Sequence, residues 1–200
     1  MKHRTTGCNS VSRETEARLT VYVTVLLDWN RRINLVSRTD VPHVWARHIE
    51  DSLQLIPLFP PDLDRAIDLG SGAGFPGLVI AVATGIHVDL VESDQRKAAF
   101  LREAARATGA PVAIHAVRAE DAAIPPASLV TARALAPLRK LLGIAHRFIA
   151  PGGVALFPKG ASGERELTEA RAEWNMRVER FPSRTHPDGA ILKLSEVERA

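Results

Sequence analysis

The sequence predicts an α/β domain in which a mostly parallel sheet is covered by helices on both faces. From about residue 64 onward, short apolar runs of strand length alternate with longer segments of helical spacing. Parallel strands need crossover helices, and those helices bury both faces of the sheet. A glycine-rich turn after the first strand and an acid after the second place a ligand site at one edge of that sheet.

The composition favours a single globular domain over residues 1–200. Hydrophobic residues make up 46% and charged residues 24%, which excludes a disordered chain and a coiled coil. No apolar run reaches the roughly 18 residues that cross a bilayer, and the polar start lacks the apolar core of an export signal. Cys8 is the only cysteine, which excludes disulfides, cysteine-based zinc sites and thiol redox pairs. We expect a cytoplasmic protein that binds neither a membrane nor a metal.

Two helices are predicted ahead of the sheet. They form an extension over residues 12–58, after a start at 1–11 that we expect to be disordered. Apolar side chains recur at helical spacing from about residue 12 to 32, and again from residue 41 until Pro57 ends the pattern. No linker follows, so we expect both helices to dock on the sheet as part of the same domain.

The cofactor-binding core is predicted over residues 64–195. Strands are expected at 66–70, 88–92, 111–117, 128–134, 153–159 and 190–194, with a further candidate at 176–181. Helices are expected at 76–84, 95–108, 137–149 and 163–174. These seven strands and four helices fit a sheet that is covered on both sides.

The most informative segment is the glycine turn at 68–77, DLGSGAGFPG, which joins the first strand to a helix. Glycines there let the backbone turn sharply and approach a ligand closely. Glu92 ends the next strand, 20 residues after Gly72, where it can accept hydrogen bonds from both ribose hydroxyls of an adenosine. Strand, turn, helix and acid together predict a nucleoside-cofactor site.

The identity of the cofactor has two candidates, because Gly72-x-Gly74-x-x-Gly77 also fits the pattern of dinucleotide enzymes. Asp68 would oppose an anionic pyrophosphate, whereas it suits a cationic sulfonium or ammonium group. A dehydrogenase would also need a proton-relay group beside the hydride, and none is evident in the sequence. S-adenosylmethionine is therefore the better fit.

Positive charge gathers late in the chain. Of the 26 basic residues 21 are arginine, the side chain suited to bidentate contacts with phosphates and bases. Residues 122–163, the acid-free stretch, contain no acid but hold five cations: Arg133, Arg139, Lys140, Arg147 and Lys159. This stretch is a candidate surface for a polyanion. The alternative is a part of the interior that has few charges of either sign.

Several motifs together resemble the bacterial guanine-N7 methyltransferases of small-subunit ribosomal RNA, also called the glucose-inhibited division protein B family. The motifs are DLGSGAGFPG, VESDQRKAAFLREA, VRAED, TARALAPL and FPKG, preceded by WNRRINLVS and RHIEDSL. The resemblance runs from about Leu26 to Lys193. It implies a class I S-adenosylmethionine-dependent methyltransferase fold, which is Rossmann-like, with seven strands and one antiparallel edge strand. It also implies small-subunit ribosomal RNA, or an assembly of that ribosomal subunit, as the partner.

The same resemblance implies a cofactor site. Gly70, Gly72 and Phe75 would border the methionine and adenosyl parts of the cofactor, and Glu92 would hold the ribose. The pair Ala119 and Glu120, after the third strand, would frame the adenine. The alternative for Glu120 is a plain surface position in a loop.

On the substrate side, the resemblance implies that Arg133 lines both the cofactor pocket and the pocket for the target base. Lys159 would face the RNA, and with Arg139 and Lys140 it forms our candidate set of phosphate contacts. A solvated strand end is the alternative for Lys159. Because apolar strand residues flank Arg133, it needs a ligand or a buried acid as its partner.

The chemistry of guanine N7 requires no catalytic base, because this nitrogen carries a free lone pair. We therefore assign no general base, and we interpret His48 as a hydrogen-bonded packing group rather than a catalyst. Methylation of a ring carbon through a cysteine is disfavoured by the position of Cys8, and an amino-group target by the sequence ARALAPL. A small-molecule methyltransferase and a non-catalytic RNA-binding module remain as alternatives.

Overall fold

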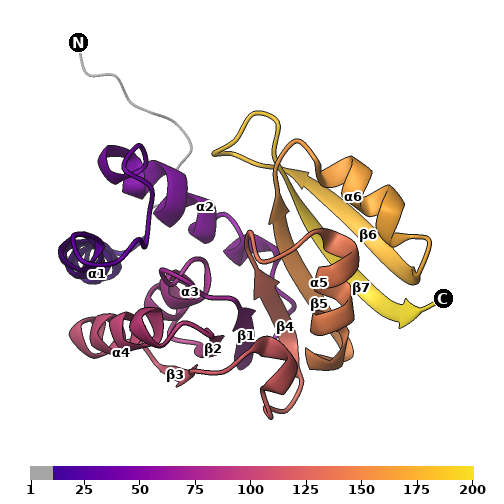
Figure 1. The fold of residues 1–200 in the computed structure, drawn as a ribbon, viewed down its shortest axis with the longest axis horizontal. Coiled ribbons are helices and arrows are strands. Elements are labelled where there is room, and N and C mark those ends of the chain that lie inside the picture. Colours follow the sequence, from indigo (N-terminus) through magenta and orange to yellow (C-terminus); the bar gives the residue numbers. More distant parts are fainter. Residues whose placement is uncertain (1–10) are drawn as a thin grey trace.

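The computed structural model, which describes residues 11–200, contains one seven-stranded sheet with helices on both faces (Figure 1). The strand order is β3-β2-β1-β4-β5-β7-β6. The strands are β1 (Arg65–Leu69), β2 (His87–Val91), β3 (Val112–His115), β4 (Ala127–Ala132), β5 (Ile149–Lys159), β6 (Trp174–Pro182) and β7 (Ala190–Arg199). This confirms the predicted α/β class and its seven strands. The segment expected to be disordered was 1–11. Its residues 1–10, which include Cys8, lie outside the described residues. Val11 is described and packs against the core.

The antiparallel strand corrects one expectation. From β3 to β5 all neighbouring strands are parallel, and β7 is antiparallel to both β5 and β6. It therefore lies inside the sheet and not at its edge. The physical reason is the short connection at 183–189, which returns β7 beside β6 as a hairpin and leaves β6 at the edge.

Two groups of helices cover the two faces of the sheet (Figure 1). Along β4 and β5 the side chains alternate, so that Leu129 and Leu156 join one buried cluster while Val130 and Phe157 join the other. One face carries α1 (Arg13–Asn30), α2 (Glu50–Leu53), α3 (Gly77–Thr84) and α4 (Gln95–Thr108). The other carries α5 (Leu138–Ala145) and α6 (Gly163–Ala170).

Local sequence sets the helix ends. Ser12 caps α1, since its hydroxyl accepts from the Thr15 amide at 3.1 Å. Asp94 caps α4 by accepting from the amides of Arg96 and Lys97. Gly109 ends α4 with a left-handed φ of 64°. The described residues contain no helix that is long and apolar enough to cross a membrane.

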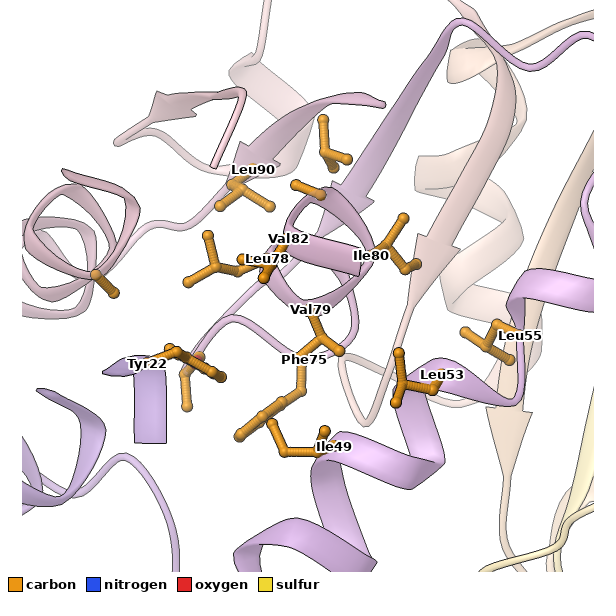
Figure 2. Packing of buried hydrophobic residues seen from close by; sticks show 14 of the residues in the cluster. Tyr22, Ile49, Leu53, Leu55, Phe75, Leu78, Val79, Ile80, Val82 and Leu90 are labelled. Carbon is orange, nitrogen blue, oxygen red and sulfur yellow. The ribbon is translucent and has the colours of Figure 1, made fainter. Parts of the chain in front are cut away.

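The second predicted helix is broken into short pieces. It consists of a 3-10 turn, η1 (Val41–His43), a π turn, η2 (Trp45–Ile49), and α2, and a further 3-10 turn, η3 (Ile56–Leu58), follows. The apolar spacing alone could not reveal the π turn, in which the Glu50 amide donates to the Trp45 carbonyl, five residues back. With this turn in place, Ile49 packs into the cluster around Phe75 and Tyr22, as Figure 2 shows.

Candidate functional site

The glycine turn lies between β1 and α3, at the carboxyl edge of the parallel strands. Gly70 and Gly72 have left-handed φ angles of 67° and 56°. A Cβ on Gly70 would stand only 2.7 Å from Leu135 Cδ1. The Gly70 and Ser71 amides donate to the Val91 carbonyl, which fixes the turn to the end of β2. The backbone at Gly70 is thus held where a side chain would have no room.

Asp68 lies beneath this turn and is fully buried. The Oδ1 of Asp68 accepts from the Thr131 hydroxyl at 2.7 Å. A Cβ added to Gly77 would lie only 2.6 Å from the Cβ of Asp68. Burial raises the pKa of Asp68 to about 6, although hydrogen bonds oppose that rise. Because no part of this carboxylate faces solvent, it can favour a cationic ligand only through its electrostatic field and not by direct contact.

Glu92 connects the turn to the end of β2. Its two oxygens accept from the amides of Gly72 and Asp94, both at 2.8 Å, and the residue is 7% exposed. Ala119 and Glu120 lie in a short 3-10 turn after β3, η4 (Ala119–Asp121). Ala119 is buried, whereas Glu120 is exposed. The structure thus brings Glu92 against the glycine turn and sets Ala119 and Glu120 further along the same edge.

Arg133, just after β4, is the centre of a compact cluster. Its Nη1 donates to His48 Nδ1 at 3.0 Å and to Asp51 Oδ2 at 3.1 Å. Its guanidinium carbon lies 5.0 Å from the centroid of the Phe75 ring, on which His48 also stacks at 4.8 Å. The buried acid that the sequence required for Arg133 is therefore Asp51, which is 6% exposed.

His48 is neutral in this cluster. Burial, and then the charge of Arg133, lowers the pKa of His48 to about 4. Since Nδ1 accepts from Arg133, the hydrogen-bond geometry assigns the ring proton to Nε2. That nitrogen is buried and lies 3.7 Å from Asp40 Oδ2. The packing interpretation of His48 agrees with these contacts.

Two concave spaces meet at this cluster. The smaller, of about 210 Å³, lies between the glycine turn and the loop residues Leu35, Val36 and Ser37. The larger, of about 690 Å³, extends past Lys159 to the hairpin that joins β6 to β7. Both are lined by the same four residues: Asp40, His48, Arg133 and Ala134. Arg133 thus lines both spaces, and a transfer between two ligands needs such an adjacency.

Three of the five cations in the acid-free stretch have acidic partners in the folded chain, among them Arg133, which pairs with Asp51. Lys159 donates to Glu166 at 2.9 Å and to the Ala136 carbonyl at 3.1 Å, and its side chain is 9% exposed. Arg139 pairs with Glu173 at 2.7 Å. Arg147 donates to the carbonyls of Ala119 and Ala122. Lys140 is exposed and has no ion partner among the described residues.

Sequence reasoning missed two supports of the site. Asp51 also accepts from the Thr185 hydroxyl at 2.6 Å and from the Gln54 amide at 2.8 Å, so it ties Arg133 to the β6–β7 hairpin. Tyr22 of α1 donates from its hydroxyl to the Ala73 carbonyl in the glycine turn. Asp51 lies within the RHIEDSL motif, but nothing in the sequence pointed to Tyr22 or to Thr185.

Comparison with known sequences agrees with this geometry. A sequence profile of the GidB family, described as rRNA small subunit methyltransferase G, matches residues 15–188. The Ribosomal RNA small subunit methyltransferase G of Granulibacter bethesdensis is 58% identical over 191 residues, which cover 96% of this chain and 90% of that protein. The protein of the same name from Gluconobacter oxydans is 53% identical over 95% of this chain and 98% of its own length.

Solved structures share the fold. A TehB-like SAM-dependent methyltransferase from Corynebacterium glutamicum matches with a TM-score of 0.55 and 17% identity, over 72% of this chain and 86% of that one. The ribosomal protein L11 methylase from Lactobacillus delbrueckii subsp. bulgaricus matches with a TM-score of 0.57 and 15% identity, over 73% and 76%. The fold is that of class I methyltransferases. The chain belongs to the GidB family, rRNA small subunit methyltransferase G, and is an S-adenosylmethionine-dependent methyltransferase.

Proposed function

We propose that this protein methylates N7 of a guanine in small-subunit ribosomal RNA, in the cytoplasm. The observation that carries the proposal is the sharing of Arg133 and His48 by two concave spaces, one of which is bounded by the glycine turn. The family membership supports ribosomal RNA as the substrate class. The substrate is either the free RNA or the RNA within an assembly of the small ribosomal subunit.

In this proposal the smaller space receives the part of S-adenosylmethionine that lies next to the glycine turn. Gly70, Gly72 and Phe75 lie in the wall of this space, and the two glycines have a left-handed backbone there. Glu92 would hold the ribose, with the lone pairs that remain beside its two amide hydrogen bonds. Ala119 and Glu120 would frame the adenine beyond β3.

The larger space would receive the target nucleotide. Arg133 and Lys159 line it, and Asp51 and Glu166 balance their charges. Guanidinium and ammonium groups that are held in such pairs stay fixed in position, and their remaining N–H groups can still donate to a base. Arg139 and Lys140 lie outside on α5, where Arg139 pairs with Glu173 and Lys140 has no ion partner among residues 11–200.

The reaction needs positioning and no base. The cofactor supplies a methyl group on a positively charged sulfur, and the lone pair of N7 can attack it without losing a proton. The residues at the junction hold the base in line with the methyl group and exclude water. Because His48 is neutral and its Nδ1 is taken by Arg133, it orients that guanidinium and accepts no proton from the substrate.

The test is to analyse small-subunit ribosomal RNA by mass spectrometry, from cells with and without this gene. We expect one 7-methylguanosine to disappear when the gene is absent and to return with the purified protein and S-adenosylmethionine. The purified protein should act on free RNA or on isolated small subunits, and the comparison tells which form is the substrate. Transfer to a small molecule, or binding without transfer, would contradict the proposal.

The cofactor assignment is tested with Glu92→Ala, measured by calorimetry with S-adenosylhomocysteine. Loss of two charge-assisted hydrogen bonds should weaken binding by about 2 to 4 kcal/mol. Glu103→Ala, which removes an exposed carboxylate of α4, is the matched control. Circular dichroism checks that the variant is folded, because Glu92 also holds two backbone amides. Unchanged affinity in a folded variant would place the cofactor elsewhere.

A further inference from the structure

The loop that joins α1 to η1 forms one wall of a trough that leads to the proposed cofactor site. Residues 30–38 line a concavity of about 730 Å³. This concavity shares Leu35, Val36 and Ser37 with the space at the glycine turn. At its other end it shares Arg32, Ile33 and Asn34 with a concavity of about 360 Å³, which reaches the first turn of α4. A chain-like ligand could therefore lie from α4 to the junction at Arg133.

Cations without acidic partners line this trough. Arg32 and Arg38 are exposed and Lys97 is half-buried, and none of the three has an ion partner among the described residues. Two more arginines are only loosely paired, Arg31 with Asp28 at 3.5 Å and Arg96 with Asp94 at 3.6 Å. Among the residues that the structure describes, Asp94 is the only acid in the wall of these two outer concavities.

The loop holds its cations on a fixed scaffold. The Asn30 side chain accepts from the amides of Leu35 and Val36, at 2.8 and 3.0 Å. Ser37 donates to Asp40 Oδ2 at 2.7 Å, and Ile33, Leu35 and Val36 pack against the core. The backbone of the loop is thus held in place, so that on binding a polyanion only the side chains of its cations need to be ordered.

We propose that Arg32, Arg38 and Lys97, the trough cations, bind the phosphodiester backbone of the substrate RNA next to the target nucleotide. The charge suits a polyanion, and the continuity with the cofactor space suits a strand whose base reaches the junction. This inference rests on the proposed function, since it takes ribosomal RNA as the substrate. It assigns the main phosphate contacts to the face of the sheet that carries α1 and α4, opposite the face that carries α5.

The experiment compares two triple variants of equal charge change. The first replaces Arg32, Arg38 and Lys97 by Ala. The control replaces Arg13, Arg102 and Arg106 by Ala, three exposed cations of α1 and α4 that line none of these concavities. Both are titrated at several salt concentrations with an unmodified transcript of small-subunit ribosomal RNA, and separately with S-adenosylhomocysteine.

For the trough variant we expect the slope of log K against log[salt] to be smaller by about 2, from three lost contacts at roughly 0.7 each. Its KM for RNA should rise at least tenfold, while kcat and the affinity for S-adenosylhomocysteine stay unchanged. The control should keep the slope of the wild type. Both variants should show wild-type circular dichroism, because the six side chains lie on the surface or at its edge.

Three results would overturn the assignment: equal salt slopes in the two triple variants, a loss of S-adenosylhomocysteine binding in the trough variant, or a defect seen with small subunits but not with the free transcript. The last result would point to a ribosomal protein as the partner of these cations. A failure of the proposed function looks different, because the wild-type protein would then transfer no methyl group to the RNA in any form.

Discussion

The acid-free stretch and the trough at residues 30–38 show opposite relations between sequence and charge. The stretch contains no acid from 122 to 163, yet three of its five cations pair with acids from other segments, which are Asp51, Glu166 and Glu173. The trough has acids close to it in sequence, and still its Arg32, Arg38 and Lys97 have no ion partner within residues 11–200. The charge that a partner meets is thus decided by the fold and not by the local count.

Burial explains the difference. Arg133 and Lys159 are largely removed from water, and a desolvated cation is costly unless a carboxylate and hydrogen-bond acceptors surround it. The trough cations are solvated at little cost, so nothing in the fold requires that they be paired. Two classes of substitution follow. Breaking a pair in the stretch should lower stability, and removing a trough cation should lower RNA affinity alone.

The largest effect is expected for Asp51→Ala. It leaves Arg133 without its carboxylate and deprives the Thr185 and Gln54 side chains of an acceptor. We expect the free energy of unfolding to fall by about 3 to 5 kcal/mol, measured by urea denaturation. Asp51→Leu combined with Arg133→Met should recover much of that stability but no methyl transfer. A fully stable Asp51→Ala protein would show that the pair is not buried as described.

The next effect is expected for Glu166→Ala. This carboxylate accepts from Lys159, from the Leu138 amide at the start of α5 and from the Ser162 hydroxyl. Losing it should destabilise the protein by about 1.5 to 3 kcal/mol. Lys159→Met should cost less and should leave the salt slope of RNA binding unchanged, because this ammonium is already paired. A smaller slope in Lys159→Met would show instead that Lys159 contacts a phosphate.

Short-range patterns in the sequence sufficed for most of the fold. Short apolar runs predicted strands at 66–70 and 88–92, and the strands are Arg65–Leu69 and His87–Val91. The last strand continues to Arg199, beyond the predicted residue 194, because Val197 is the only apolar residue in its outer half and no apolar run marks that half. Hydrophobic spacing predicts a strand only where several apolar residues recur, so this half escapes it.

The residues of the site likewise fall into those that a local sequence pattern predicts and those that it does not. The glycine turn and Glu92 were predictable because they lie 20 residues apart in a fixed strand-turn-helix-strand order. The bond between Asp51 and Thr185 spans 134 residues, and no local pattern encodes it. For the same reason the partners of the acid-free stretch could not be read from its own residues. The roles of individual residues toward cofactor and RNA stay predictions until the variants are measured.

A third prediction concerns the buried groups between the two regions, His48 and Asp68. The pKa of His48 is lowered to about 4, so between pH 4 and 6.5 the unfolded chain binds more protons there and stability rises with pH. The pKa of Asp68 is raised to about 6, so between pH 4 and 6 the folded chain binds more protons and stability falls with pH. The pH dependences of stability that His48 and Asp68 contribute therefore have opposite signs.

We therefore expect the urea midpoint of the wild-type protein to change little between pH 4.5 and 6. Asp68→Asn should make it rise with pH over that window, and His48→Asn should make it fall. The measurement is a series of urea titrations at fixed ionic strength. If both variants kept the flat profile of the wild type, neither group would titrate as its burial implies.

The smallest effect is expected on α5, where the two classes of cation stand side by side. Arg139 pairs with Glu173 in an exposed position, so Arg139→Ala should change stability by less than about 1 kcal/mol. It should also leave the salt slope of RNA binding unchanged, because its charge is already balanced. Lys140 is exposed and unpaired among the described residues, so Lys140→Ala should lower that slope by about 0.7 if α5 meets the RNA. If both variants kept the salt slope of the wild type, the phosphate contacts would be restricted to the trough. If only Arg139→Ala changed that slope, RNA would have to displace Glu173 from Arg139. Ion pairing in the free protein would then not decide which cations bind RNA.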